Sequence, residues 1–344
     1  MMRRNFLVAA GMLLALVGTA EARPFTDAGG RIVEIPDTIT RVLPAGPPAA
    51  VLVYSVSPDA LAGWINEPSA KAKPFLLPDA ATLPAYGRLT GKGGTANMEA
   101  VLAAKPDIII DVGTVNDTYA SLADKVQAQT GIPYILIDGS FAKTAETYRL
   151  LGDLLGEKDR AELLAAYAEK TQTELTEGLA KVSDGQHPRV YYGRGADGLE
   201  TGMKGSINLE ILGVVGAVNV AETTGEGGLT TVSPEQVLGW NPDIIIAADP
   251  AFAASVKTDP VWSEIAAVKN GKVFAAPTLP FGWFDSPPGV NRLIGVNWLE
   301  NLFYPEIFKN DLPAEVKAFY KTVYQVELTD DQVKQLLTGA IATP

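Results

Sequence analysis

Two stretches of the chain share one pattern of polar and apolar positions. Residues 97–110 read NMEAVLAAKPDIII and residues 233–246 read SPEQVLGWNPDIII, with eight of fourteen positions identical at a constant offset of 136 residues. Each stretch has a polar residue suited to a helix N-cap, a short apolar helix, a Pro-Asp turn and a β-branched run typical of a buried parallel strand. Helix, turn and strand recur in any α/β protein, but the shared Glu and Pro-Asp favour a true repeat. The pattern predicts one α/β unit present twice, with a groove between two lobes.

The first lobe is predicted at residues 23–141. Residues 24–36 alternate around a Gly-Gly pair, which indicates a β-hairpin. Strand patterns separated by helical stretches follow around residue 42 and at residues 61–64, 108–111 and 134–137.

A helical pattern at residues 142–184 predicts the link between the lobes. Residues 157–182 contain no proline, and no glycine before Gly178, so we expect a helix about 36 Å long there. The second lobe is predicted at residues 185–344. Its expected elements are strands at 189–192, 244–246 and 272–275, a helix capped by Ser286 that runs from Pro287 to about Phe303, and helices at 314–323 and 329–337.

The first 22 residues have the composition of a signal peptide. A basic start is followed by an apolar run at residues 6–17 and by Ala20-Glu21-Ala22, which fits a cleavage site before Arg23. The chain contains no cysteine, hence no lipid-accepting Cys and no disulfide. No later apolar run is long enough to span a bilayer. We expect a soluble periplasmic protein without a lipid anchor and not inserted in the membrane.

Charge and residue usage exclude several function classes. A net charge of −12 disfavours nucleic acid as a partner. The only histidine, His187, lies in a polar stretch, and a lone His without Cys argues against a bare zinc or manganese site. No GxSxG motif is present to support a secreted α/β hydrolase. We therefore expect no catalytic residue, no metal ligand and no cofactor.

Three segments together carry a family resemblance: residues 25–36 (FTDAGGRIVEIP), the two repeats, and residues 281–293 (FGWFDSPPGVNRL). The chain resembles the periplasmic binding proteins of ABC importers for iron complexes and cobalamin, over essentially its whole length after residue 22. The resemblance implies an α/β fold with two Rossmann-like lobes on central, mainly parallel sheets, joined by one long α-helix, with a ligand cleft between the lobes. It also implies modest closure on ligand binding, in contrast to proteins with flexible hinges.

The repeat also suggests a docking surface. In related importers an acidic residue on each lobe contacts arginines of the two permease subunits, and Glu99 and Glu235 match that motif. A local role is the alternative, because each Glu falls in the first turn of a predicted helix, where a carboxylate interacts favourably with the dipole. The expected partner is an ABC permease dimer in the inner membrane, contacted by a monomeric binding protein.

Ligand residues are expected in loops at the carboxyl ends of the strands. A ferric siderophore is bulky and rich in oxygen, so its site should combine guanidinium donors with aromatic faces. The alternatives are an exposed loop charge for Arg88 and a core position for Trp283, while Arg292 is expected to form a surface salt bridge. The predicted ligand residues are Gly46, Pro47, Arg88, Thr114, Tyr192, Arg194, Trp283 and Phe284.

Residues 193–198 match GxGxxG directly after a strand, but turn residues follow where a dinucleotide site needs a helix. We therefore interpret this stretch as a glycine-rich ligand loop or hairpin. The function expected first is a receptor that delivers an iron(III) siderophore to an ABC importer. The alternatives are molybdate or tungstate, for which a helix N-terminus at Ser286 could supply amides, and cobalamin or haem.

Overall fold

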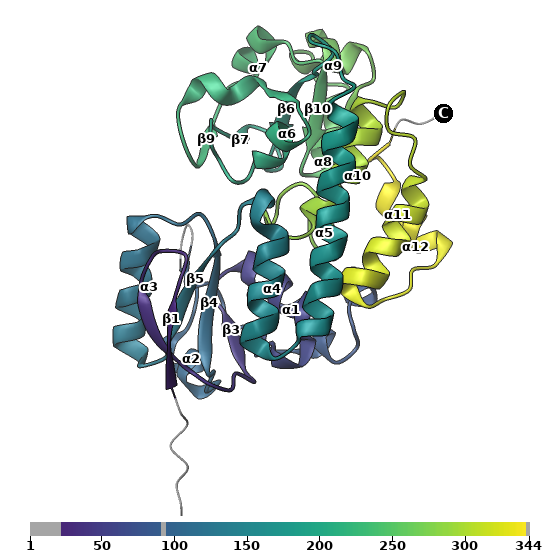
Figure 1. The fold of residues 1–344 in the computed structure, drawn as a ribbon. Helices are drawn as coiled ribbons and strands as arrows, with labels where there is room; N and C mark the ends of the chain where they lie inside the picture. The colour runs from purple at the N-terminus through teal and green to yellow at the C-terminus, as the bar shows by residue number, and fades with distance from the viewer. Residues whose placement is uncertain (1–21, 91–93, 342–344) are drawn as a thin grey trace, which may run out of the picture.

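The computed structural model describes residues 22–90 and 94–341, so the predicted signal peptide at 1–22 lies outside the described residues except for Ala22. Figure 1 shows two α/β lobes, one above the other, with the long helix α5 (Lys158–Leu179) running along both. The predicted fold class is confirmed. None of the described helices is both long and apolar enough to cross a membrane.

The first lobe is built on a parallel sheet. Its strand order is β3 (Val42–Pro44), β4 (Ile108–Gly113), β5 (Tyr134–Asp138), and the predicted hairpin forms from β1 (Ala22–Thr26) and β2 (Ile32–Pro36). Residues 61–64 contribute only isolated bridges at Leu61 and Trp64 instead of the predicted strand. The helices of this lobe are α1 (Pro47–Val56), α2 (Met98–Ala103) and α3 (Asp117–Thr130).

The link between the lobes is a pair of packed helices. Helix α4 (Thr144–Leu155) ends at Gly156, which adopts a left-handed φ of +75°, and α5 then runs for 22 residues. Arg149 on α4 forms ion pairs with Glu162 and Glu169 on α5, at 2.8 and 2.6 Å. The predicted long helix is therefore present, and α4 packs against its first half.

The second lobe repeats the plan of the first. Its main sheet is parallel, with the order β11 (Val273–Ala275), β10 (Ile244–Ala247), β6 (Arg189–Gly193), β8 (Val218–Asn219). A small antiparallel hairpin pairs β7 (Glu200–Gly202) with β9 (Leu229–Thr231). Its helices are α6 (Glu210–Val214), α7 (Pro234–Trp240), α8 (Pro250–Ser255) and α9 (Ala266–Lys269).

The two repeats occupy equivalent places in the two lobes. Asn97 caps α2 and Ser233 caps α7, and each helix leads through its Pro-Asp turn into an interior strand, β4 or β10. The middle isoleucine of each triplet packs in a core of its own lobe, whereas the outer two pack in one core that extends through both lobes and the C-terminal helices. Both sheets are thus covered on both faces, which explains the continuous β-branched runs.

The C-terminal helices correct one prediction. The helix expected to begin at Pro287, capped by Ser286, is α10 (Arg292–Phe303), which begins five residues later. Ser286 cannot cap a right-handed helix, because its φ is +68° and Asp285 Oδ1 accepts its backbone N–H at 2.7 Å. Helices α11 (Leu312–Phe319) and α12 (Asp330–Leu337) follow, with a π-helical turn at Tyr320–Tyr324. This segment returns to the first lobe, where the Tyr54 hydroxyl donates to the Tyr324 carbonyl at 2.8 Å. The lobe boundaries drawn from the sequence remain predictions.

Glu300 on α10 gives the C-terminal packing a dependence on pH. Its side chain is 1% exposed, Asn310 Nδ2 donates to Oε1 at 2.9 Å, and Oε2 has no hydrogen-bond partner among the described residues. Burial, assisted by the negative charges of Glu174 and Glu315, raises the pKa of Glu300 from 4.5 to about 8. The folded protein thus holds a neutral carboxylic acid at neutral pH.

We expect the free energy of unfolding to fall as the pH rises from about 5 to about 8. The folded state holds a proton that the unfolded state releases above its lower pKa, so the stabilisation is complete below pH 4.5 and lost as the pH passes 8. The loss is on the order of 4 kcal/mol. Thermal melts across this range should show a steeper decline for the wild type than for Glu300→Gln, and parallel curves would contradict the assignment.

Candidate ligand cleft between the lobes

Three adjoining hollows form a cleft between the lobes. The arginine pocket, about 360 Å³, contains Arg88, Arg194, Asn208 and Asp285. The central pocket, about 170 Å³, shares Arg88 and Asn208 with the arginine pocket. The acidic pocket, about 410 Å³, shares Gly113, Thr114, Val115 and Ile207 with the central pocket and also contains Asp138, Glu210 and Glu222. Since neighbouring pockets share walls, one continuous cleft carries basic groups at one end and carboxylates at the other.

The parallel sheets determine which segments reach the cleft. Gly46 and Pro47 follow β3, Thr114 follows β4 and Arg194 follows β6, so all four lie beyond the carboxyl ends of strands. Together with Arg88 they line the arginine and central pockets. Five of the eight predicted ligand residues are therefore brought together at the cleft. Their role in binding stays a prediction.

The two arginines of the arginine pocket differ in their charge partners. Arg194 Nε lies 2.7 Å from Asp285 Oδ2, and Nη1 is ion-paired with Glu200. Arg88 forms no ion pair with a described residue, and its loop is held by its backbone N–H, which donates to Thr95 Oγ1 at 3.1 Å. The free positive charge of this pocket is therefore that of Arg88.

The central pocket meets the start of α1. Gly46 is the N-cap of this ten-residue helix, and a Cβ there would lie 2.9 Å from Thr90 Oγ1, so a larger residue would displace the pocket wall. Beneath it, Asp111 accepts hydrogen bonds from Tyr134 at 3.1 Å and from Thr90 at 3.3 Å. Burial raises the pKa of Asp111 above its usual value.

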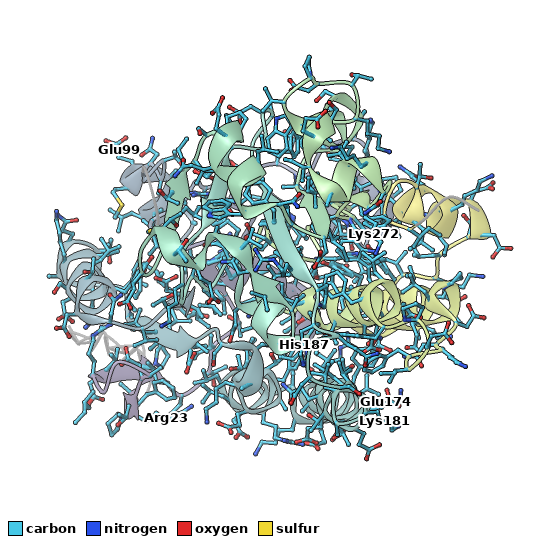
Figure 2. All side chains as sticks on the ribbon, turned by 90° about the horizontal axis from the view of Figure 1, so that it is seen from above. Arg23, Glu99, Glu174, Lys181, His187 and Lys272 are labelled. Atoms are coloured by element: carbon cyan, nitrogen blue, oxygen red, sulfur yellow. The ribbon has the colours of Figure 1, made fainter. Side chains whose placement is uncertain are left out.

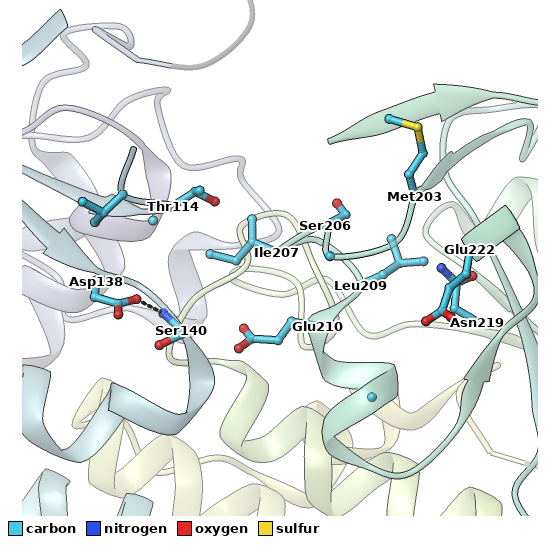
Figure 3. A pocket seen from close by; sticks show the side chains of 14 residues that line it. Thr114, Asp138, Ser140, Met203, Ser206, Ile207, Leu209, Glu210, Asn219 and Glu222 are labelled. Atoms are coloured by element: carbon cyan, nitrogen blue, oxygen red, sulfur yellow. Dashed lines mark hydrogen bonds between the residues drawn. The ribbon is translucent and has the colours of Figure 1, made fainter. Parts of the chain in front are cut away.

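Carboxylates dominate the acidic pocket, which Figure 3 shows from close by. Asp138 and Ser140 extend from the first lobe, and Asp138 Oδ1 accepts the Ser140 backbone N–H at 2.9 Å. Glu210 and Glu222 face them from the second lobe, with Ile207 between this pocket and the central one. An anionic ligand is repelled at this end of the cleft.

Three predicted ligand side chains lie in the protein core instead. Tyr192 is 1% exposed, and Trp283 and Phe284 are fully buried. Tyr192 stacks on Phe284 with ring centroids 4.0 Å apart, and the Trp283 indole N–H donates to the Tyr320 hydroxyl at 3.1 Å. Tyr192 belongs to an interior strand covered on both faces, which leaves no open side from which its ring could contact ligand. The burial of Trp283 therefore agrees with its alternative interpretation as a core residue.

Arg292 corrects a second prediction. It was expected in a surface salt bridge, but it is 1% exposed and ion-paired with Glu210 beneath the acidic pocket. Its Nη2 donates to the carbonyl of Gly139 at 2.6 Å, while Glu210 accepts the Phe141 backbone N–H at 3.0 Å. Since Gly139 and Phe141 follow the last strand of the first lobe, this pair joins the two lobes. This ion pair could not be predicted from the sequence, because Glu210 and Arg292 are distant in the chain.

Other groups at the cleft were also not among the predicted ligand residues. Asp285 follows the predicted pair Trp283 and Phe284 directly, and Asn208 precedes α6. Their convergence in the arginine pocket depends on chain segments far apart in sequence. His187 lies outside all three pockets, with its Nδ1 3.3 Å from the Tyr304 hydroxyl. Among the described residues no cluster of three or more acidic or histidine side chains suits a metal ion.

Glu99 and Glu235 are exposed on the first turns of α2 and α7. Figure 2 shows Glu99 on the side of the molecule opposite Glu174 and Lys181, which mark α5 and its C-terminal end. Each lobe therefore carries one of the two glutamates, and Glu99 lies far from the helix that joins the lobes.

Comparison with known proteins agrees with this architecture. Residues 55–279 match the family model described as periplasmic binding protein. The molybdate-binding protein MolA of Haemophilus influenzae is 28% identical, over 96% of this chain and 99% of its own. The structure of an ABC transporter solute-binding protein from Sulfurospirillum deleyianum is 31% identical, with a TM-score of 0.83 over 92% of this chain and 99% of its own. MolA bound to molybdate has the same fold, at 24% identity and a TM-score of 0.74 over 89% of this chain and 99% of its own. The chain belongs to the periplasmic binding protein family.

Proposed function

We propose that this protein is the solute receptor of an ABC importer and that its ligand is a tetrahedral oxyanion, molybdate or tungstate, bound at the arginine pocket. The observation that carries the proposal is the pairing of Arg88 from one lobe with Arg194 from the other in a single pocket, beside the amide side chains of Asn66 and Asn208. Guanidinium and amide N–H groups are the donors that a small oxyanion accepts from.

The charge distribution supports this end of the cleft. Arg88 has no ion pair with a described carboxylate, so its positive charge is available to a dianion. The start of α1 adds the positive end of a helix dipole at Gly46. Asp138 and Glu222 disfavour an anion at the other end, where Glu210 is ion-paired with Arg292. The likeness to MolA, a molybdate-binding protein, points to the same ligand class.

A ferric siderophore, the ligand expected first from the sequence, is the second candidate. The connected cleft offers room beyond a tetrahedral oxyanion, since its hollows measure about 360, 170 and 410 Å³. However, the aromatic faces assigned to such a chelate on Tyr192, Trp283 and Phe284 are buried in the core. Because these three aromatic faces are not available in the cleft, we rank the oxyanion above the siderophore.

Calorimetric titrations of the purified protein with molybdate, tungstate, sulfate, a ferric hydroxamate, a ferric catecholate and haem test the proposal. We expect saturable binding of molybdate and tungstate and none of the iron complexes. Binding of an iron complex alone would replace the oxyanion by the siderophore or haem. Binding of none of these compounds would reject both candidates.

Arg88→Gln should weaken molybdate binding at least tenfold. The substitution keeps a polar side chain in the arginine pocket but removes its unpaired charge, and a charge-assisted hydrogen bond contributes about 1.5 kcal/mol or more. Glu222→Gln, which alters the exposed carboxylate of the acidic pocket, is the matched control and should change the dissociation constant by less than threefold. Equal effects of the two variants would argue against binding at the arginine pocket.

A receptor role also implies a transport partner and a cellular location. The protein would work in the periplasm as a monomer and hand its ligand to a permease dimer in the inner membrane. The exposed Glu99 and Glu235, at equivalent positions of the two repeats, would contact one permease subunit each.

A further inference from the structure

Asp285 connects the polar groups on the second-lobe wall of the arginine pocket. The residue is 2% exposed and precedes Ser286 in the loop that leads to α10. Its Oδ1 accepts hydrogen bonds from Asn208 Nδ2 at 2.8 Å and from the Ser286 backbone N–H at 2.7 Å. Its Oδ2 lies 2.7 Å from Arg194 Nε. One buried carboxylate therefore contacts three of the groups that line this pocket.

The ion pair between Asp285 and Arg194 is sealed from water. Neither Arg194 Nε nor Asp285 Oδ2 is accessible to solvent, and neither has an aligned hydrogen bond among the described residues. Each is therefore held by the charge of the other, at short range and with little screening by salt. Glu200, the second partner of Arg194, differs in being 38% exposed at its side chain.

We propose that Asp285 is a positioning residue that fixes Arg194 and Asn208 against the second-lobe wall, and that this preorganisation sets the affinity of the arginine pocket for a tetrahedral oxyanion. The inference rests on the function proposed above. Arg194 has five N–H donors and many rotamers, and Asn208 lies in a loop, so both would lose freedom on binding if they were not already held. Asp285 already holds both side chains in the free protein, so less conformational entropy is lost when the ligand binds.

Charge alone makes the opposite prediction, which separates the two explanations. Both Asp285 and Glu200 lower the positive potential of Arg194. If their charge were all that mattered, neutralising either one would strengthen the binding of a dianion. If Asp285 positions the donors, neutralising it weakens binding, although neutralising Glu200 does not.

The test compares Asp285→Asn with Glu200→Gln by calorimetric titration with sodium molybdate. Asn retains an oxygen for Asn208 and the Ser286 N–H but removes the charge that holds Arg194. We expect Asp285→Asn to bind at least fivefold more weakly than the wild type, and Glu200→Gln to bind as tightly or more tightly. Tighter binding by both variants would overturn the proposal. Thermal melts without ligand establish that each variant is folded.

A double variant covers the case in which Asp285→Asn alone does not fold. Arg194→Gln with Asp285→Asn replaces the buried ion pair by two neutral side chains that can hydrogen-bond, which leaves no unpaired charge. If Asp285 acts through Arg194, this double variant should bind molybdate no more weakly than Arg194→Gln, which keeps the carboxylate charge of Asp285. A further loss in the double variant would show that Asp285 acts by another route and would overturn the proposal.

A measurement without ligand separates this proposal from the proposed function. In NMR spectra of the free protein, the Arg194 Nε–H proton, which faces Asp285, should exchange slowly with water in the wild type and in Glu200→Gln, and rapidly in Asp285→Asn. Slow exchange of this proton in Asp285→Asn overturns the positioning role even if molybdate binds. If the wild type binds no oxyanion, the proposed function fails, while the NMR result still decides whether Asp285 holds Arg194.

Discussion

Reversing both docking charges, Glu99→Arg together with Glu235→Arg, is expected to abolish uptake of the ligand by cells and to leave the affinity of the purified protein unchanged. Both carboxylates are exposed and lie outside the three cleft pockets, so the binding site keeps its donors. The Glu235 pKa is lowered by its own backbone N–H and by Ser233, which keeps this carboxylate charged at neutral pH. Two arginines facing permease arginines would repel the partner at both contacts.

The alternative role of these residues, a favourable contact with a helix dipole, predicts a different outcome. Loss of a first-turn carboxylate costs about 0.3 to 1 kcal/mol at each helix, which changes stability and leaves transport intact. Asp159→Arg with Glu177→Arg is a matched control, because it makes the same change in net charge on α5 and also removes a first-turn acid. Radiolabelled uptake in cells should be normal for the control and absent for the docking variant. Normal uptake in both would leave only the dipole role.

The local repeat was predictable because its information lies within fourteen residues. A polar cap, an apolar helix, a Pro-Asp turn and a triplet of isoleucines specify an element and the strand that follows it. The two strands then occupy interior positions in both sheets, as continuous apolar runs indicate. The long helix was also predicted from the sequence, because residues 157–177 contain neither proline nor glycine, the residues that most often interrupt a helix.

The cleft was predictable only in part. Gly46, Thr114 and Arg194 reach it because loops beyond strand ends lie at one edge of a parallel sheet. That rule places the backbone but not the direction of a side chain, and Tyr192, one residue before the end of β6, points into the core. The contacts of Asp285 with Arg194 and Asn208 were not predictable, because these partners are distant in sequence.

The loop before α10 shows how a local signal can mislead. A Ser followed by Pro is typical of a helix start, and it predicted a helix from Ser286. In the structure, the Asp285 side chain takes the Ser286 N–H, and Ser286 has a left-handed φ. Tertiary contacts of Asp285 in the arginine pocket thus override the capping signal, and the helix begins at Arg292.

Arg292→Met is expected to lower the free energy of unfolding by about 3 to 5 kcal/mol, the largest loss predicted for a single substitution in this protein. The guanidinium is 1% exposed, is ion-paired with Glu210 and donates to the carbonyl of Gly139 at 2.6 Å and to that of Gly289 at 3.2 Å. Met fills a similar volume but satisfies none of these acceptors. Urea denaturation followed by tryptophan fluorescence and circular dichroism measures the change.

A double-mutant cycle with Glu210→Gln separates the ion pair from the packing of Arg292. The Glu210 side chain is 28% exposed, so water can solvate its carboxylate when the arginine is lost, whereas the guanidinium left by Glu210→Gln stays buried. Glu210→Gln still offers an amide oxygen to the Phe141 N–H, so this contact is kept in the cycle. We expect the double variant to lose less free energy of unfolding than the two single variants lose together. The reason is that neither partner is then left with an unpaired charge. Strict additivity would mean that the pair does not couple the lobes, and that Arg292 stabilises them through its carbonyl contacts alone.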